Sequence, residues 1–426
     1  MGMKVLLVGS GGREHAMAWK ISRSPLLSEL LMAPGNPGMA RLGRCVSVPP
    51  SDIAELVALA KTEGVDLVVV GPESPIAAGI ANRLEKLGIP VFAPRSDAAQ
   101  LEASKVWAKS FMRRNRIPTA GFEVFSDYEE AKEYVYEACE YPCVIKADGL
   151  AAGKGVFVVK SKSEALLALD TIMVKARFGA SGREVVIEDF LKGRELSVFV
   201  ATDGYAHRFM GWAVDYKQLL DGDQGPNTGG MGTVSPVPFL GKEDLARIEE
   251  EVVQPTFEGM RKEGILYRGI LYFGLMWTDE GPSVLEYNVR MGDPEAQAVL
   301  PLMENDFLEI CVAGAQESIP KIDLIPPEGA SCCVVLASEG YPDSPVVGRI
   351  IRGAETANKL KGVHVFHAGT KEESGKLFTD GGRVLSVVGT GKDMDEARGR
   401  AYEAVSRISF DGMQFRKDIG SPGRFQ

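Results

Sequence analysis

The hydrophobic pattern of the first ninety residues alternates between two periods. Short runs rich in Val, Leu and Ile predict strands, and the segments between them carry apolar residues at helical spacing. The predicted strands are residues 4–8, 30–33, 67–70 and 89–93, and the predicted helices are residues 13–24, 52–62 and 75–87. This alternation is typical of a doubly wound parallel sheet. Because ligands of such sheets bind beyond the carboxyl ends of the strands, we expect residues 9–14, 34–38 and 71–74 to share one rim.

After residue 100 the pattern changes to a mixture of hairpins and longer helices. Residues 101–115 predict one basic helix, and residues 185–190 and 195–201 predict a hairpin that turns at Lys192 and Gly193. The other predicted strands are residues 143–147, 156–160, 269–277, 283–288, 331–337 and 384–388, and the other predicted helices are residues 243–262 and 394–408.

These changes of pattern divide the chain into three predicted domains. We predict a doubly wound substrate domain at residues 1–102, a central domain at 103–326 and a C-terminal mixed α/β domain at 327–426. The second boundary falls in residues 325–329, where two prolines and a glycine indicate a linker. The predicted fold class is therefore α/β and α+β multidomain, in line with roughly 150 residues per domain.

Composition and charge exclude several classes of protein. Apolar residues make up 45% of the 426 residues and charged residues 25%, as in ordinary folded proteins. With 58 acidic and 48 basic residues, the net charge is −10, so no overall field attracts nucleic acid. A phosphorylated ligand must therefore be bound by a local group of Lys, Arg, backbone N–H groups or a metal ion.

The cysteines and the apolar runs favour a cytoplasmic protein. None of the six Cys residues forms a CxxC pair, which indicates reduced thiols. The apolar run at residues 5–8 is too short for the core of a secretory signal. No stretch approaches the ~18 consecutive apolar residues of a membrane-spanning helix, so we expect no membrane partner.

Glycines follow the first predicted strand and open the first predicted helix, at Gly9, Gly11 and Gly12. Free backbone N–H groups at the start of a helix can bind a phosphate, and we favour this interpretation over a tight turn without a ligand. A dinucleotide site is disfavoured, because Glu14 stands where the fingerprint requires its third glycine.

A second glycine-rich segment, residues 148–155, joins two predicted strands. It contains Gly149, Gly153, Lys154 and Gly155, and Lys146 stands just before it. The segment is one residue short of a Walker A loop, lacks its Ser or Thr, and precedes a strand instead of a helix. We therefore predict a flexible cover over phosphates, and the alternative is an ordinary exposed hairpin.

The sharpest local signal is the pentapeptide that begins at Glu286 and ends at Arg290. On a strand, Glu286, Asn288 and Arg290 face the same side. Carboxylate and amide oxygens are ligands that Mg²⁺ prefers, and Arg suits bidentate binding of a carboxylate or phosphoryl group. We predict a metal site at Glu286 and Asn288, in preference to a solvated edge strand.

Two weaker signals leave their alternatives open. Residues 188–190 end a predicted strand, where backbone groups can read an adenine edge, but most such strings are surface strand ends. The glycine-dense loop 225–232 follows Asp215 and Lys217, and it either presents N–H groups to a substrate or is a mobile connector.

The histidines give no metal signal. The four His residues do not cluster in the sequence, and His364 and His367 are expected to point to opposite faces of one strand. A zinc site is therefore disfavoured.

Taken in order, these motifs resemble those of the ATP-grasp superfamily, and more narrowly those of the glycinamide ribonucleotide synthetase family. The resemblance extends over nearly the whole chain, from Val5 to Gly420. Its strings here are residues 11–16, 33–36, 70–73, 145–155, 225–232, 290–295 (with Met291 where the family has Phe), 366–370 and 416–420.

The resemblance implies an ATP-dependent ligase of purine biosynthesis. Its substrates would be ATP, glycine and 5-phosphoribosylamine, with glycyl phosphate as the intermediate and Mg²⁺ or Mn²⁺ as the metal. It further implies a central ATP-grasp fold whose mobile lid spans residues 123–188. The implied protein is cytoplasmic, a monomer or weak homo-oligomer, and binds no nucleic acid.

The resemblance also assigns roles to individual residues. The implied catalytic residues are Lys146, Asp215, Arg290 and Asp293. The implied ATP contacts are Lys105, Lys146, Gly149, Gly153, Lys154, Gly155, Glu188, Phe190 and Glu195. The implied substrate contacts are Gly11, Gly12, Glu14, Glu73, Asp215, Lys217, Asn227, Thr228, Gly229, Gly230 and Arg290, and the implied metal ligands are Glu286 and Asn288.

One departure from the wider superfamily leaves the number of metal ions open, because the strand 271–277 carries no carboxylate. Three other functions remain as hypotheses: a ligase for formate or bicarbonate, a nucleotide sensor without turnover, and a dehydrogenase on the N-terminal sheet. Dependence of ADP release on glycine would distinguish the glycine ligase from a ligase for formate or bicarbonate. Release of phosphate would exclude the nucleotide sensor, and absence of nicotinamide binding would exclude the dehydrogenase.

Overall fold

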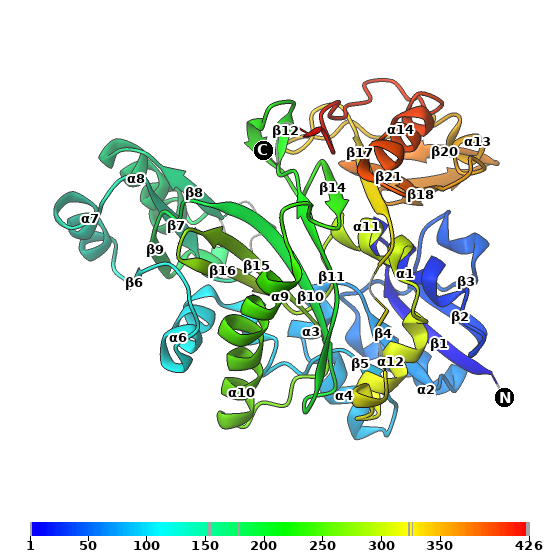
Figure 1. The fold of residues 1–426 in the computed structure, drawn as a ribbon, viewed down its shortest axis with the longest axis horizontal. Helices are drawn as coiled ribbons and strands as arrows, with labels where there is room; N and C mark the ends of the chain where they lie inside the picture. Colours follow the sequence, from blue (N-terminus) through cyan, green and yellow to red (C-terminus); the bar gives the residue numbers. More distant parts are fainter. Residues whose placement is uncertain (1, 151–154, 178, 323, 326, 423–426) are drawn as a thin grey trace.

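The computed structural model describes residues 2–150, 155–177, 179–322, 324–325 and 327–422. Its N-terminal part is a parallel sheet in the order β3-β2-β1-β4-β5, drawn in blue in Figure 1. The strands are β1 (Met3–Gly9), β2 (Leu27–Pro34), β3 (Arg44–Cys45), β4 (Leu67–Val70) and β5 (Val91–Phe92). The helices are α1 (Gly12–Ile21), α2 (Ile53–Glu63), α3 (Glu73–Ala77) and α4 (Ile80–Lys86). The predicted doubly wound sheet is confirmed.

The predicted rim of this sheet is also confirmed. Gly9 pairs with Pro34, and Asn36 Nδ2 donates to the Ser10 carbonyl over 2.8 Å. The Gly71 N–H donates to the Val8 carbonyl. The single helix expected at residues 75–87 was wrong: Gly79, with φ 79°, separates α3 from α4. Only glycine adopts this left-handed conformation readily, so the chain turns there.

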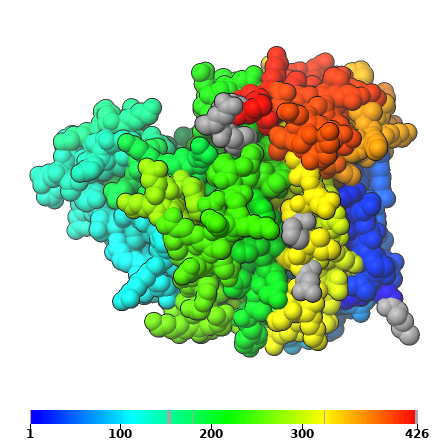
Figure 2. Space-filling view, viewed as in Figure 1, coloured from blue at the N-terminus to red at the C-terminus, as the bar shows by residue number. Residues whose placement is uncertain are grey.

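A small four-stranded unit, residues 122–189, stands out from the rest of the molecule (Figures 1 and 2). Its sheet has the order β6-β9-β7-β8 and its helices are α7 (Tyr128–Glu137) and α8 (Lys162–Leu169). Its strands are β6 (Phe122–Phe125), β7 (Cys143–Ala147), β8 (Val156–Val159) and β9 (Val185–Asp189). The unit has an apolar core of its own, formed by buried side chains between Ala131 and Ile187.

The hairpin predicted at residues 185–190 and 195–201 was wrong. β9 pairs with β6 and β7 in the four-stranded unit, whereas the next strand, β10 (Arg194–Thr202), belongs to the large sheet. The two strands bury their apolar side chains in different cores. Ile187 packs in the core of the unit, and Val198 packs in the main core.

The large sheet has eight strands in the order β16-β15-β10-β11-β14-β17-β21-β18, all paired antiparallel. After β10 its strands are β11 (His207–Asp215), β14 (Gly232–Ser235), β15 (Gly269–Thr278), β16 (Gly281–Asn288), β17 (Ala330–Ala337), β18 (Val363–His367) and β21 (Arg383–Gly391). The sheet continues past residue 326, because β14 pairs with β17. A hairpin of β12 (Gln218–Leu220) and β13 (Gln224–Asn227) projects between β11 and β14.

Helices cover this sheet and join it to the N-terminal part. They are α9 (Lys242–Ile248), α10 (Gln254–Lys262), α11 (Glu295–Leu302), α12 (Phe307–Ala315) and α14 (Met394–Val405). A π-helical turn, Glu249–Val253, connects α9 to α10, so the helix predicted at residues 243–262 is continuous. Within the described part of the chain, no helix is long and apolar enough to cross a membrane.

The basic helix predicted at residues 101–115 is divided in two, and the division shapes the site. α5 (Gln100–Ala103) ends at Ser104, whose extended backbone starts α6 (Lys105–Asn115). The Ser104 hydroxyl accepts from the Trp107 N–H and donates to Asp148 Oδ1, each over 3.0 Å. Ser104 is therefore an N-cap that also ties this helix to the start of the glycine-rich segment.

The expectation that the histidines do not cluster was also wrong. His15 on α1 and His367 on β18 have ring centroids 5.5 Å apart, and the His367 N–H donates to His15 Nδ1 over 2.7 Å. His364 packs on Trp19, with ring centroids 4.5 Å apart. These three histidines fasten the N-terminal and C-terminal parts together, a contact between residues about 350 positions apart that no local spacing can reveal.

Candidate active site

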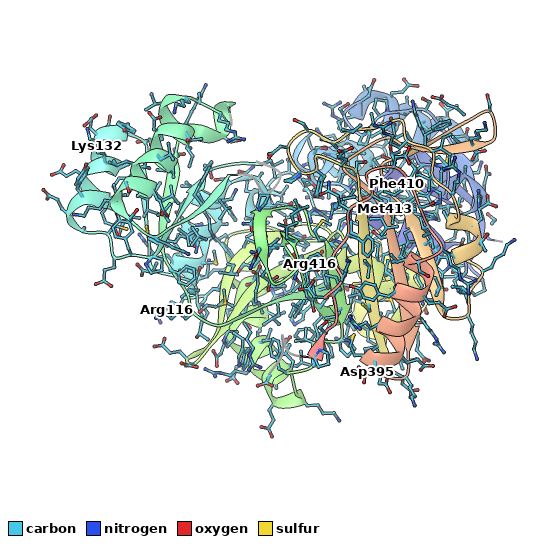
Figure 3. All side chains as sticks on the ribbon, turned by 90° about the horizontal axis from the view of Figure 1, so that it is seen from above. Arg116, Lys132, Asp395, Phe410, Met413 and Arg416 are labelled. Carbon is cyan, nitrogen blue, oxygen red and sulfur yellow. The ribbon has the colours of Figure 1, made fainter. Side chains whose placement is uncertain are left out.

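A cleft with a volume of about 380 Å³ lies where the N-terminal sheet, the four-stranded unit and the large sheet meet. Figure 3, which looks from above, shows the four-stranded unit carrying Lys132 on one side and the main body on the other. The predicted site residues that line the cleft are Glu73, Lys105, Lys146, Gly149, Gly155, Glu188, Asp215, Lys217, Thr228, Gly229, Glu286, Asn288, Arg290 and Asp293. Residues from motifs far apart in the sequence are thus brought together.

Glu286 and Asn288 project from the same face of β16 into the cleft. Tyr287 between them points the other way, and its hydroxyl is 2.9 Å from that of Thr256. Burial opposes ionisation of Glu286, but Lys217, Lys146 and Lys105 together lower its pKa. No described residue forms a hydrogen bond with the side chain of either Glu286 or Asn288, so the oxygens of both side chains remain able to bind a cation.

This pair fits a metal ion that takes its other ligands from a substrate. Among the described residues, no group of three or more His, Cys, Asp or Glu side chains has the arrangement of a protein-only metal site. Mg²⁺ is commonly held by one or two protein oxygens, with phosphate oxygens and waters completing its octahedron. Glu286 and Asn288 at the wall of a lysine-lined cleft match that arrangement.

Two lysines approach the cleft from different elements. Lys105 Nζ, at the start of α6, donates to the Gly149 carbonyl over 2.8 Å, and burial lowers its pKa. Lys146 Nζ, on β7, donates to the Leu285 carbonyl over 3.1 Å. Lys146 thus contacts β16, and both lysines line the cleft that Glu286 also lines, an arrangement that can neutralise a bound anion.

The Glu188 carboxylate is buried between two ammonium groups. Its oxygens lie 2.9 Å from Lys109 Nζ on α6 and 2.9 Å from Lys146 Nζ on β7. Burial lowers the pKa of Lys109 to about 8, although Glu188 acts in the opposite direction. This triad links the four-stranded unit to α6.

Arg290 is held by two carboxylates at the floor of the cleft. Its Nε lies 3.1 Å from Glu73 Oε2, and its Nη2 lies 2.7 Å from Glu102 Oε1. Burial raises the pKa of Glu102 to about 7, with Arg290 opposing and Glu73 adding to that effect. Burial also opposes ionisation of Glu73, but Arg290 and Arg13 lower the pKa of Glu73 below its usual value.

The glycine-rich rim encloses the Glu14 carboxylate. Glu14 Oε2 accepts from the Gly11 N–H over 2.7 Å, and Oε1 accepts from Arg13 Nε over 2.6 Å. A Cβ on Gly71 would lie 2.2 Å from Glu14 Oε1, and one on Gly9 would lie 2.3 Å from its Cγ. The glycines at these positions therefore leave the space that the carboxylate occupies.

A second group of charges lies at the end of β11. Lys217 forms an ion pair with Glu195, and its Nζ lies 3.7 Å from Asp215 Oδ1. Burial opposes protonation of Lys217, but Asp215 and Glu195 raise its pKa. Glu295, which accepts from Ser197 Oγ over 3.3 Å, has its pKa raised to about 7 by burial and by Asp215.

Comparison with known proteins accounts for this arrangement. Residues 3–102 match the N domain of phosphoribosylglycinamide synthetase, residues 103–296 match its ATP-grasp domain, and residues 331–422 match its C domain. The chain belongs to the phosphoribosylglycinamide synthetase family.

Relatives of this synthetase family align along the entire chain. A phosphoribosylamine–glycine ligase of Chlorobaculum tepidum is 48% identical over 422 residues, which cover 98% of this chain and 99% of that protein. A trifunctional purine biosynthetic protein of Gallus gallus is 46% identical, over 99% of this chain and 42% of its own length. The crystal structure of the phosphoribosylamine–glycine ligase of Thermotoga maritima superposes with a TM-score of 0.86, at 38% identity, over 97% of this chain and 99% of that one.

More distant structures share the architecture alone. The structure of a biotin carboxylase of Campylobacter jejuni superposes with a TM-score of 0.74 at 17% identity, over 97% of this chain and 93% of that one. The ATP-grasp fold with an N-terminal parallel sheet is therefore confirmed on both sequence and structure.

Several residues predicted from the synthetase-family resemblance do not line the cleft. Gly12 packs against Gln297, Gly230 against Pro294, and Asn227 Oδ1 accepts from Gln218 Nε2. The residues outside the cleft lining are Gly11, Gly12, Glu14, Phe190, Glu195, Asn227 and Gly230. Phe190 is 39% exposed just beyond β9. Gly153 and Lys154 lie outside the described residues.

The cleft also contains residues that the sequence did not reveal. They are Arg13, Glu102, Lys109, Tyr272, Glu295 and Arg383. Glu102, Lys105 and Lys109 are spaced by three and four positions, so a helical projection would have placed all of them on one side. Arg383, which lies 3.4 Å from Asp293 Oδ2, stands in no recognisable motif.

Proposed function

We propose that the protein is an ATP-dependent ligase that joins glycine to 5-phosphoribosylamine and releases glycinamide ribonucleotide, ADP and phosphate in purine biosynthesis. The observation that carries this proposal is the gathering of two oxygen donors, two lysines and Arg290 at one cleft. The family supports it, because relatives named for this reaction align with almost every residue of the chain.

The chemistry needs an activated carboxylate. The glycine carboxylate is a poor acyl donor, because its leaving group would be oxide. Transfer of the γ-phosphoryl group from ATP gives glycyl phosphate and ADP. The amine nitrogen of 5-phosphoribosylamine then forms the new C–N bond as the C–O bond to phosphate breaks, and the nitrogen loses a proton. The protein contributes mainly by positioning groups and neutralising charge.

We assign the phosphate-binding role to the lysines on either side of the cleft. Lys105 and Lys146 hold the α- and β-phosphates beside Gly149 and Gly155, which also line the cleft. A divalent cation, Mg²⁺ or Mn²⁺, held by Glu286 and Asn288 supplies charge neutralisation at the phosphoryl group. The backbone of Glu188 and Phe190 and the carboxylate of Glu195 are proposed for the adenosine.

We place glycine between Arg290 on one side of the cleft and the carboxylates of Asp215 and Asp293 on the other. Arg290, braced by Glu73 and Glu102, binds the glycine carboxylate, while Asp215 and Asp293 receive its ammonium group. The other proposed substrate contacts are Lys217, Asn227, Thr228, Gly229 and Gly230 for glycine, and Gly11, Gly12, Glu14 and Glu73 for 5-phosphoribosylamine. Glu14 and Glu73 suit an amine-bearing sugar, because both lie at the rim of the N-terminal sheet and a carboxylate can accept hydrogen bonds from an amine.

Glycyl phosphate hydrolyses in water, so the cleft must exclude solvent during the reaction. We propose that residues 123–188, which have their own apolar core, close over the cleft as a rigid lid. Small-angle X-ray scattering tests this directly. Addition of Mg²⁺ with a non-hydrolysable ATP analogue should reduce the radius of gyration, and an unchanged radius would contradict lid closure.

The decisive experiment measures ADP and glycinamide ribonucleotide while ATP, glycine and 5-phosphoribosylamine are omitted one at a time. We expect full turnover only with all three substrates present. Turnover with formate or bicarbonate in place of glycine would identify a different ligase. Binding of ATP without release of phosphate would identify a sensor, and reduction of a nicotinamide cofactor would identify a dehydrogenase.

Three finer statements are part of the same proposal. The metal is Mg²⁺ or Mn²⁺, the enzyme works in the cytoplasm, and it is a monomer or a weak homo-oligomer. The division at residues 102 and 326 is the domain organisation that we propose. Analytical ultracentrifugation of the purified chain tests the oligomeric state.

A further inference from the structure

The last described residues of the chain clasp the β12–β13 hairpin. Arg416 is 1% exposed, and Figure 3 places it near the middle of the molecule, between the green strands and the C-terminal helix α14. Its Nε and Nη2 donate to Asp418 over 2.8 and 2.6 Å, and its Nη1 donates to Asp223 over 2.8 Å. The same Nη1 donates to the Gln218 carbonyl over 3.2 Å. One guanidinium thus joins its own segment to strand β12 and to the turn of the hairpin.

The clasp is reciprocal, because the hairpin turn also binds the C-terminal segment. The Lys417 N–H donates to Asp221 Oδ1 over 2.7 Å, and the Gly222 N–H donates to Asp418 Oδ2 over 2.9 Å. The Gly420 N–H donates to the Tyr216 hydroxyl over 2.9 Å. The Arg416 guanidinium lies over the Tyr216 ring, 5.0 Å from its centroid. Residues 416–420 therefore fix the hairpin at its base and at its tip.

The base of this hairpin is part of the cleft. Lys217 precedes β12, and Thr228 and Gly229 follow β13; all three line the cleft. The Thr228 N–H and hydroxyl both donate to the Lys217 carbonyl over 2.8 Å, so the two sides of the loop are tied together. Any shift of the hairpin therefore moves Lys217 and Thr228 relative to Arg290 and Glu286, which stand on the other side of the cleft.

A buried guanidinium is costly unless every N–H group finds an acceptor. Here the acceptors come from two segments almost two hundred positions apart, and two of them are carboxylates. We propose that Arg416 is a positioning residue for glycine: it holds the β12–β13 hairpin in the one place where Lys217 and Thr228 complete the glycine pocket. This proposal rests on the proposed function, and the test separates the two.

The test compares steady-state kinetics of Arg416→Ala, Arg416→Lys and Asp223→Asn with those of the wild type. We expect Arg416→Ala to raise the KM for glycine by about ten- to a hundredfold, with the KM for ATP nearly unchanged, since displacements of about 1 Å have effects of this size. Arg416→Lys keeps the charge but cannot reach all the acceptors, so it should restore only part of the loss. Asp223→Asn changes only the acceptor that the hairpin supplies to Arg416, so it should raise the KM for glycine by a smaller factor.

Arg407→Ala is the matched control, because Arg407 lies at the surface in the turn just after α14 and its guanidinium pairs with Glu403 of that helix. A merely structural role for Arg416 would lower kcat for lack of folded enzyme and leave every KM at the wild-type value. That result, in Arg416→Ala or, if this variant does not fold, in Asp223→Asn, would overturn the proposal.

Hydrogen–deuterium exchange distinguishes failure of this inference from failure of the proposed function. If the wild type forms no ADP in response to glycine, the proposed function is wrong. Faster exchange confined to residues 218–230 in Arg416→Ala would still support the positioning role. Exchange at wild-type rates in residues 218–230 would overturn it, whatever the activity.

Discussion

Arg290 and Glu102 form a buried ion pair, with Nη2 and Oε1 2.7 Å apart, although they are 188 positions apart in the sequence. Glu102 also accepts the Val289 N–H over 2.7 Å. The end of β16, which carries the predicted metal ligands, is thereby attached to the short helix α5. The position of Arg290 in the cleft thus depends on a carboxylate from the boundary between the first two predicted domains.

The first prediction concerns the pH dependence of this pair. Burial raises the pKa of Glu102 from 4.5 to about 7, so the folded protein binds this proton more tightly than the unfolded chain. The resulting stabilisation is complete below about pH 4.5 and is lost as the pH rises through about 7. Glu102→Gln lacks it, so the stability of the wild type relative to this variant should fall by about 2 kcal/mol between pH 5 and pH 8. Urea denaturation at both pH values measures this, and parallel changes in the two proteins would contradict it.

The second prediction concerns the metal. Glu286→Ala removes the one carboxylate of the proposed pair, and we expect ADP formation to fall by about a hundredfold or more while the protein stays folded. Glu280→Ala is the control, because Glu280 is an exposed carboxylate in the turn between β15 and β16, the strand that carries Glu286. Chelation with EDTA should abolish activity, and Mg²⁺ or Mn²⁺ should restore it. Full activity of Glu286→Ala, or activity that survives EDTA, would refute the assignment.

The third prediction concerns the glycine-rich rim. In Gly71→Ala, the added Cβ would lie 2.2 Å from Glu14 Oε1, so the carboxylate must move. We expect the KM for 5-phosphoribosylamine to rise about tenfold, with the KM values for ATP and glycine little changed. Gly399→Ala is a suitable control, since a Cβ there meets nothing within 4 Å. Equal effects on all three KM values would show that Glu14 has no specific role.

The fourth prediction concerns acid stability. Burial lowers the pKa of His364 and of His367 to about 4 and that of His15 well below its usual value. The unfolded chain therefore takes up protons first, and stability is lost as the pH falls from about 6.5 through about 4. The expected cost is about 2 kcal/mol at pH 5 for each of His364 and His367.

His364→Phe tests this point, because a phenyl ring can keep the contact with Trp19 without binding a proton. Thermal unfolding followed by circular dichroism should show a smaller loss of stability between pH 8 and pH 5 in this variant than in the wild type. The same loss in both proteins would mean that His364 does not titrate during acid unfolding.

Much of the fold could be predicted from the sequence, because its signals are local. Uninterrupted apolar runs such as residues 67–70 indicate buried parallel strands, and β4 coincides with that range. Breaks in helices were harder to predict. Ser104 and Gly79 both lie inside helical patterns, and only the observed cap and the left-handed backbone show that the chain bends there. The partner of β9 was missed, because a turn signal does not specify which core a strand joins.

The sequence predicted those site residues that lie close together on one strand. The alternation of Glu286, Asn288 and Arg290 needs only strand periodicity, and the cleft contains all three. Glu102, Glu295 and Arg383 enter the cleft through contacts between distant segments. Glu102 and Arg383 are each buried beside an opposite charge, and Glu295 is buried near Asp215; these neighbours exist only once the chain has folded.

The pairing of β14 with β17 has a consequence for anyone who divides this chain. β14 is completely buried, and its outer edge bonds to β17 from residue 232 to residue 235. A truncated product that ends near residue 326 would carry an open row of N–H and C=O groups along that edge. Such a row recruits strands from other molecules, so shortened versions of this protein should form aggregates unless the missing piece is supplied in trans.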